Sequence, residues 1–194
     1  LTNRSRIGPH PLLVPTLDMV TIGAGGGSIA WVEGGFGLRV GPHSAGSVPG
    51  PACYGLGGTQ PTVTDANLVL GRLNASYFLG GARTLDLARA TEAIRSKVAE
   101  PLRMTIEAAA FGIIAIAEAH MADAIRLVSV ERGLDPRDFT LVAFGGAGPL
   151  HAGLLLREAG LGGVLVPRYP GLFAAAGLNV LVFLGYTLPR GVRQ

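Results

Sequence analysis

The most regular alternation of apolar and polar positions runs over residues 106–128. On a helix that advances about 100° per residue, the apolar side chains share one arc and the charged side chains fall on the other side. This pattern predicts a long helix with one face in the core, which ends before Gly133. The apolar arc holds Ile106, Ala110, Ile113, Ala117, Met121, Ala124 and Val128, and the polar side holds Glu107, Glu118, Asp123 and Arg126.

Two shorter helices are predicted before it. Residues 84–99 form an amphipathic pattern that Pro101 is expected to end, because proline lacks the backbone N–H that a helix needs. Residues 66–73 predict a further helical piece, with Thr64 or Asp65 as its cap.

Apolar runs near the start of the chain predict strands. Prolines frame residues 10–15, which favours an extended segment. Residues 17–22 predict a strand that leads into the glycine-rich loop 23–28. Residues 29–32 and 36–40 flank a glycine turn and predict a β-hairpin.

A strand, loop, helix, strand unit is predicted in the second half of the chain. Residues 139–144 are continuously apolar, as in a strand buried on both faces, and the glycine-rich loop 145–149 follows them. A helix over residues 151–159 and a second buried strand over 164–167 complete the unit. The fold class is therefore α/β, with a right-handed crossover between parallel strands.

The two glycine-rich loops are candidates for binding a phosphate or a nucleotide. Glycine lets backbone N–H groups converge on an anion, and the start of a helix adds a favourable dipole. Neither loop matches a P-loop or the dinucleotide pattern Gly-x-Gly-x-x-Gly with its later acidic residue. Close packing between strand and helix is the structural alternative.

Residues 41–64 predict a long irregular loop, because glycine, proline, serine, threonine and alanine dominate them. Such loops in compact domains are often functional. Polar residues in or beside this loop could hold zinc or a nucleotide-bound magnesium, although their spacing selects no particular set of ligands. Several of these residues could instead cap a helix. Cys53 could be a nucleophile, but it has no evident partner for that role. The polar residues are Asp18, His43, Ser44, Cys53, Thr62, Thr64, Asp65 and Asn67.

Two histidines on predicted helices have two interpretations each. His151 starts the helix after the second glycine loop, where it could face a ligand or be an ordinary polar residue of the first turn. His120 lies on the apolar arc of the long helix, and we expect a histidine at the edge of the core with its polar atoms satisfied.

Composition narrows the class of protein. Of the 194 residues, 48% are hydrophobic and 15% charged, which is enough for a sizeable core and excludes disorder. The net charge of +3 is not gathered into a stripe, so nucleic-acid binding has no support. A single cysteine excludes an internal disulfide and, with no secretory leader in the sequence, favours the cytoplasm.

An uncharged stretch over residues 169–189 is long enough to span a bilayer. Glycines, Pro170 and Asn179 divide it into two short apolar runs, so we expect a buried helix and strand rather than a membrane span.

Several separated motifs resemble the hydantoinase A/oxoprolinase family. Residues 21–32 read Thr-Ile-Gly-Ala-Gly-Gly-Gly-Ser-Ile-Ala-Trp-Val, residues 49–55 read Pro-Gly-Pro-Ala-Cys-Tyr-Gly, and residues 62–73 read Thr-Val-Thr-Asp-Ala-Asn-Leu-Val-Leu-Gly-Arg-Leu. Residues 129–139 and 142–152 resemble the family's next segment, the latter with Phe-Gly-Gly-Ala-Gly-Pro-Leu-His. The resemblance extends to Gly177, and residues 178–194 form a divergent or truncated tail.

The resemblance implies an actin/hexokinase-like ATPase fold, a mixed sheet with flanking helices and a nucleotide between two lobes. It implies ATP and Mg²⁺ as cofactors and a cyclic amide as substrate, 5-oxoproline first and a hydantoin next, opened through a phosphorylated intermediate. It implies catalytic roles for Asp65 and His151 beside the cleft. The nucleotide-binding residues that it implies are Gly25, Gly26, Gly27, Ser28, Gly145, Gly146, Ala147 and Gly148.

Family members also include subunits of ketone carboxylases, and a non-catalytic module that binds a hydantoinase B-type subunit is a further alternative. The family's phosphate loop of the Asp-x-Gly-Gly-Thr-x-Thr-Asp kind is not found in these residues. We therefore expect activity from the intact parent protein and not from these residues alone.

Overall fold

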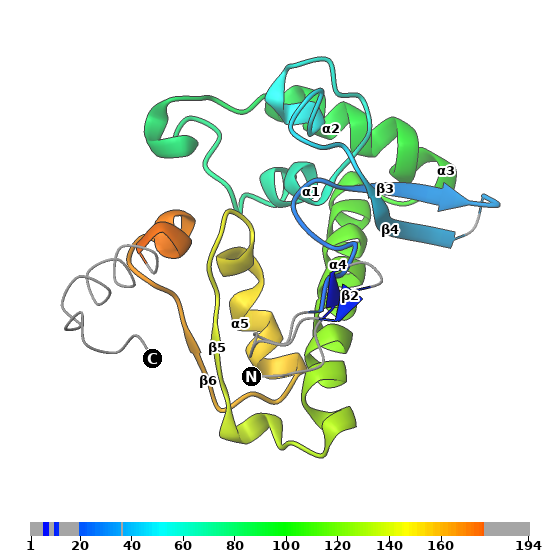
Figure 1. Cartoon of the computed structure of the whole chain (residues 1–194). Helices are drawn as coiled ribbons and strands as arrows, with labels where there is room; N and C mark the ends of the chain where they lie inside the picture. Colours follow the sequence, from blue (N-terminus) through cyan, green and yellow to red (C-terminus); the bar gives the residue numbers. More distant parts are fainter. Residues whose placement is uncertain (1–5, 8–9, 12–19, 36, 177–194) are drawn as a thin grey trace.

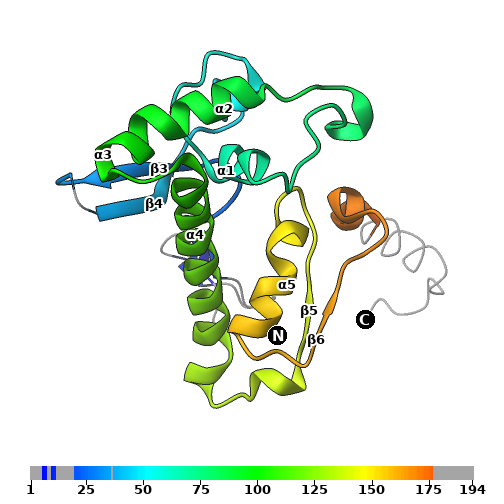
Figure 2. The same ribbon diagram turned by 180° about the vertical axis from the view of Figure 1, so that it is seen from behind.

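The computed structural model describes residues 6–7, 10–11, 20–35 and 37–176. The long helix α4 (Ile106–Val128) runs through the molecule (Figure 1). The β3/β4 hairpin and helices α1 to α3 gather at its first half, and α5 with β5 and β6 lies beside its second half, as the reverse view in Figure 2 also shows.

The predicted hairpin is confirmed. Strand β3 (Ser28–Glu33) pairs antiparallel with β4 (Gly37–Ser44), and the turn between them contains two glycines with positive φ. β4 is longer than predicted, because Ser28 pairs with Ser44 across a bulge, so the first residues of the expected loop belong to the strand.

The strands expected before the hairpin are described only in part. β1 (Arg6–Ile7) pairs antiparallel with β2 (His10–Pro11), which is the start of the extended segment predicted over 10–15. The strand predicted over 17–22 is wrong in its described part, since residues 20–22 are exposed and form no strand. Residues 12–19 lie outside the described residues.

Helix α1 (Val63–Val69) begins earlier than predicted. Its N-cap is Thr62 and not Thr64 or Asp65, because Thr62 and Asp65 form a capping box in which each side chain accepts from the other's backbone N–H. Every residue from Val63 to Leu68 is buried. α1 therefore lies inside the molecule, packed on α2 and α4.

The second predicted helix continues past its expected end. α2 (Leu87–Ile94) is capped by Asp86, passes into a π-helical turn (Arg95–Ala99) and continues as α3 (Glu100–Leu102). Pro101 therefore lies within helical structure, after a widened turn of the kind that relieves a broken hydrogen-bond ladder. The helix ends at Arg103, which has a left-handed conformation.

Helix α4 has the predicted bounds and packs with small side chains. Thr105 caps it, and Ala109, Ala110, Ile113 and Ala117 are fully buried against the hairpin, α1 and α2. Among the described residues, the segment from Ile106 to Arg132 is the one helical stretch long and apolar enough to cross a membrane. Its packed face makes it the core helix of this fold.

The predicted βαβ unit is confirmed, but its strands are not buried. β5 (Thr140–Val142) pairs parallel with β6 (Gly163–Leu165), and α5 (Gly148–Glu158) connects them. Val142 and Leu165 are exposed, because no described layer covers their face of this sheet. The described strands form three two-stranded sheets and not one mixed sheet, within an α/β arrangement.

A buried ionic contact joins α5 to α4 and to the end of α1. Glu118 was predicted on the solvent side of α4, and this prediction is wrong, since the side chain is 3% exposed. Its Oε1 lies 3.1 Å from Nδ1 of His151 on α5 and accepts from Arg72 at 3.3 Å. The two partners offset part of the cost of burying the carboxylate.

We expect Glu118→Ala to lower the free energy of unfolding by about 3 kcal/mol, because it leaves His151 and Arg72 without their shared acceptor. Glu107→Ala, on the exposed first turn of the same helix, is the control and should change it by less than about 1 kcal/mol. Urea unfolding followed by circular dichroism measures both. Equal losses in the two variants would contradict the assigned role of the contact.

Candidate functional site

The two predicted glycine loops meet in space, although they come from distant parts of the chain. A Cβ atom built on Gly26 would lie 3.5 Å from Cβ of Ala147. A cavity of about 350 Å³ opens between the loops, which we call the interloop cavity. It is lined by Gly26, Gly27, Gly46, Pro51, Tyr54, Thr64, Asn67, Leu73, Phe78, Leu79, Gly146, Ala147 and Leu150.

The first glycine loop is closed by a serine and held by α1. The N–H of Gly25 donates to Oγ of Ser28 at 2.9 Å, and the Ser28 hydroxyl donates to the carbonyl of Gly23. The carbonyl of Gly26 accepts from both the N–H and the hydroxyl of Thr64, at 2.9 and 2.8 Å. Of the four predicted residues here, Gly26 and Gly27 line the cavity, while Gly25 and Ser28 shape the loop.

The second glycine loop leads directly into α5. Gly145 has a φ of +84° and its N–H donates to the carbonyl of Pro170. Ala147 is the N-cap of α5 and no side chain caps the helix. A Cβ built on Gly146 would meet no atom within 4 Å, so this residue faces open space. An uncapped helix start beside an open glycine is a favourable position for an anion.

The lining of the cavity is of two chemical kinds. Glycine backbone from both loops contributes to it, and the side chains of Pro51, Tyr54, Leu73 and Phe78 add apolar surface to the cavity wall. The rings of Tyr54 and Phe78 lie 5.7 Å apart. Such a combination suits a ligand with an anionic group and a flat or apolar group.

Asp65 organises the loop that forms this wall. Its carboxylate is fully buried and accepts from the N–H groups of Ala52, Cys53 and Thr62 and from the Thr62 hydroxyl, at 2.7 to 3.2 Å. It does not line the cavity. The contacts give Asp65 a structural role, and its catalytic role stays a prediction.

His151 lies below the second loop and not in the cavity wall. It is fully buried, its Nδ1 contacts Glu118, and its Nε2 has no hydrogen-bond partner among the described residues. The sequence did not identify Glu118 as the partner of His151, or Arg72 as the second partner of Glu118, because the spacing of these residues matches no common motif. The expected contact between His151 and a ligand stays a prediction.

The remaining candidates of the long loop do not form a metal site. Within the described residues no three histidine, cysteine, aspartate or glutamate side chains gather, and Asp18 lies outside them. His43 and Ser44 are exposed. Cys53 is 1% exposed, and burial, followed by the negative charge of Asp65, raises the pKa of its thiol well above its usual range, which disfavours a nucleophilic role.

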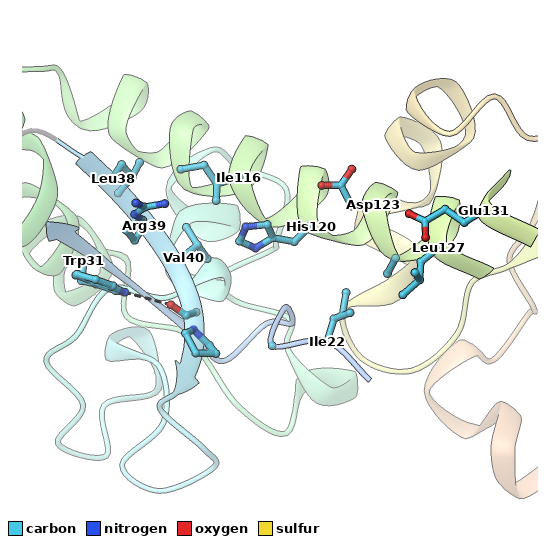
Figure 3. A pocket seen from close by; sticks show the side chains of 14 residues that line it. Ile22, Trp31, Leu38, Arg39, Val40, Ile116, His120, Asp123, Leu127 and Glu131 are labelled. Carbon is cyan, nitrogen blue, oxygen red and sulfur yellow. Dashed lines mark hydrogen bonds between the residues drawn. The ribbon is translucent and has the colours of Figure 1, made fainter. Parts of the chain in front are cut away.

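A second, larger pocket lies between the hairpin and α4, and we call it the hairpin groove (Figure 3). It has a volume of about 760 Å³, and Leu38 and Val40 of β4 face Ile116 and His120 of α4, while Trp31 lines its margin beyond β4. The prediction of a core-edge His120 is wrong, because the groove leaves its side chain exposed. The first glycine loop contributes only Gly23 to this pocket.

Comparisons with known proteins agree on one family. The family model described as hydantoinase/oxoprolinase matches residues 1–181. Caprolactamase subunit alpha of Pseudomonas jessenii is 50% identical over 174 residues, which cover 90% of this chain and 24% of the relative.

Two solved structures share the fold. The ATP-dependent caprolactamase from Pseudomonas jessenii has a TM-score of 0.81 at 48% identity over 91% of this chain and 26% of that one. A nucleotide-free acetone carboxylase has a TM-score of 0.81 at 33% identity, over 90% and 25%. The chain thus spans about a quarter of the length of these relatives.

We expect Asp65→Ala to lower the free energy of unfolding by about 3 to 5 kcal/mol, because three buried N–H groups lose their acceptor. Asp86→Ala is the matched control, since this exposed carboxylate caps α2 and its loss should cost about 1 kcal/mol. Urea unfolding gives the stabilities, and limited proteolysis reports opening of residues 45–62. A stable Asp65→Ala variant with a protected loop would exclude the anchoring role.

Proposed function

The chain belongs to the hydantoinase/oxoprolinase family, and we propose that it forms part of an ATP-dependent enzyme that opens a cyclic amide. The observation that carries the proposal is the meeting of two glycine loops around one cavity. An actin/hexokinase-like ATPase fold, expected from the resemblance, and a cytoplasmic location belong to the same proposal.

In this proposal the polyphosphate of ATP lies against the glycine backbone that lines the cavity. At the uncapped start of α5, Pro149 has no N–H and the N–H of Leu150 donates to the carbonyl of Ala147. The helix start therefore offers the N–H of Gly148 and the positive end of the helix dipole, and Gly146 leaves room for close approach. None of the described residues that line the cavity carries a carboxylate, so these residues would hold Mg²⁺ only through the phosphates. These residues would contribute positioning and electrostatic stabilisation.

The proposed reaction activates the amide before water opens it. The amide oxygen takes the γ-phosphoryl group, and the bond between that group and ADP breaks. Water adds to the ring carbon, the C–N bond breaks and the nitrogen takes a proton, and a second water releases phosphate. The role of this chain is to hold the nucleotide in place for the first step.

A lactam is the substrate class that we favour. Caprolactamase is named for a lactam, and 5-oxoproline, the substrate expected from the family resemblance, is also one. A hydantoin is the next candidate. We propose a hydantoinase B-type subunit or domain as the partner, supported by the description of the caprolactamase relative as a subunit.

Two alternatives rest on specific observations. Fold similarity to acetone carboxylase supports a subunit of an ATP-dependent ketone carboxylase. The exposed apolar side chains of Val142, Phe144 and Leu165 support a non-catalytic module that packs against another subunit or domain. In the first case ATP is still consumed, and in the second it is not bound.

The substrate class is tested by ADP release from the full protein, with and without its partner subunit. The compounds are 5-oxoproline, a hydantoin, caprolactam and acetone with bicarbonate. We expect release with a cyclic amide. If only acetone with bicarbonate caused ADP release, the carboxylase function would be favoured. If the folded protein did not bind ATP, both enzymatic functions would be excluded.

We expect Gly146→Val to weaken MgATP binding at least tenfold, because the new side chain fills space beside the start of α5 without touching protein atoms. Gly153→Val is the matched control, since Gly153 also has no atom near its Cβ position and lies further along the same helix. Isothermal titration measures both affinities. Unchanged binding by Gly146→Val would show that the second glycine loop is structural.

A further inference from the structure

One residue in the wall of the interloop cavity carries a buried polar atom that has no hydrogen-bond partner among the described residues. The side chain of Asn67 is 1% exposed, and its Nδ2 donates to the carbonyl of Val63 at 3.0 Å. Its Oδ1 is buried and accepts no hydrogen bond from any described residue. Buried acceptors are nearly always paired, because leaving one unpaired destabilises the folded state.

The position of Asn67 connects this oxygen with the cavity. Asn67 lies on α1 one turn after Val63 and forms part of the wall together with Thr64 and Leu150. Its amide nitrogen is already bound to the helix backbone, and the Thr64 hydroxyl is bound to Gly26. Oδ1 is therefore the free polar group that Asn67 can offer to a molecule in the cavity.

We propose that Asn67 is a specificity residue, whose Oδ1 accepts a hydrogen bond from a neutral N–H or O–H donor of the ligand in the interloop cavity. The inference rests on the proposed function, since it concerns the ligand of the same cavity. The glycine backbone of both loops and the start of α5 would bind the anionic group of the ligand. Asn67 would then favour ligands that carry a hydrogen-bond donor at the correct distance from its Oδ1, because the amide oxygen of asparagine is a hydrogen-bond acceptor.

Selectivity is the expected effect of such an acceptor. A site with an unpaired acceptor prefers the ligand that carries the matching donor over an analogue without it, because only the first ligand pairs the buried acceptor. The donor can belong to the base or sugar of a nucleotide, or to the amide N–H of a cyclic substrate. Both sources share the same chemistry, and matched ligand pairs distinguish them.

The experiment measures affinities of the full protein for pairs of ligands that differ by one donor. The pairs are ATP with purine riboside triphosphate, ATP with 2′-deoxy-ATP and with 3′-deoxy-ATP, and 5-oxoproline with its N-methyl derivative. Wild type is compared with Asn67→Leu, which keeps the branched shape of the side chain, and with Asn67→Ala, which leaves room for water. For one of these ligand pairs, we expect both variants to bind the donor-bearing ligand at least tenfold more weakly than wild type does. The same variants should bind the analogue without the donor with the affinity of wild type.

Thermal unfolding without ligand separates this role from a structural one. Removing an unpaired buried acceptor should leave the Tm of Asn67→Leu equal to or above that of wild type. A lower Tm with the same loss of affinity for every ligand would overturn the proposal. Variants that bind all ligands as wild type does would also overturn it, and would leave ATP binding intact as the proposed function. A wild-type protein that binds neither nucleotide nor cyclic amide would instead refute the proposed function, and this inference with it.

Discussion

The buried carboxylate of Asp65 fixes the position of the long loop against helix α1. Its two oxygens accept four hydrogen bonds, three from backbone N–H groups on the loop and one from the Thr62 hydroxyl. Hydrogen bonds to a charged acceptor in a dry environment are stronger than neutral ones. The Pro51 and Tyr54 wall of the interloop cavity, the start of α1 and the support of the first glycine loop all depend on this group.

A second buried carboxylate fixes the other side of the cavity. Glu118 holds His151 of α5 and Arg72 at the end of α1, so both glycine loops are tied to the same long helix. The alanine-rich face of α4 allows close packing with the hairpin and α1. The distance between the loops is thus controlled by α4, which belongs to neither of them.

Periodicity was a good guide to single elements of this fold. The bounds of α4 followed from its helical period, because that helix buries one face. The β3/β4 hairpin and the βαβ unit followed from apolar runs separated by glycine-rich segments, although β4 is longer than predicted and the strands of the βαβ unit are not buried. Helix starts were harder. Thr62 competes with Thr64 and Asp65 as a cap, and only the capping box selects it. The continuation through Pro101 depends on a π turn that has no sequence signature.

The candidate site was predictable as a set of loops and not as a set of contacts. The glycine motifs identified both loops, and the structure brings Gly26 and Ala147 together. Glu118 was predicted to face solvent because helical periodicity contains no information about its partners, His151 on α5 and Arg72 after α1. For Asn67 the sequence offered only a polar residue near a loop, since an unpaired acceptor becomes visible only when all its neighbours are known.

The double hydrogen bond between Thr64 and the Gly26 carbonyl sets the polarity of the first loop. A trans peptide unit carries its C=O and its N–H on opposite edges, so anchoring the carbonyl of Gly26 toward α1 turns the N–H of Gly27 away from α1. Glycines allow a peptide plane to flip at little steric cost, and two bonds to a residue 38 positions away oppose that flip. The direction in which the N–H of Gly27 points is therefore determined by Thr64, a residue outside the loop.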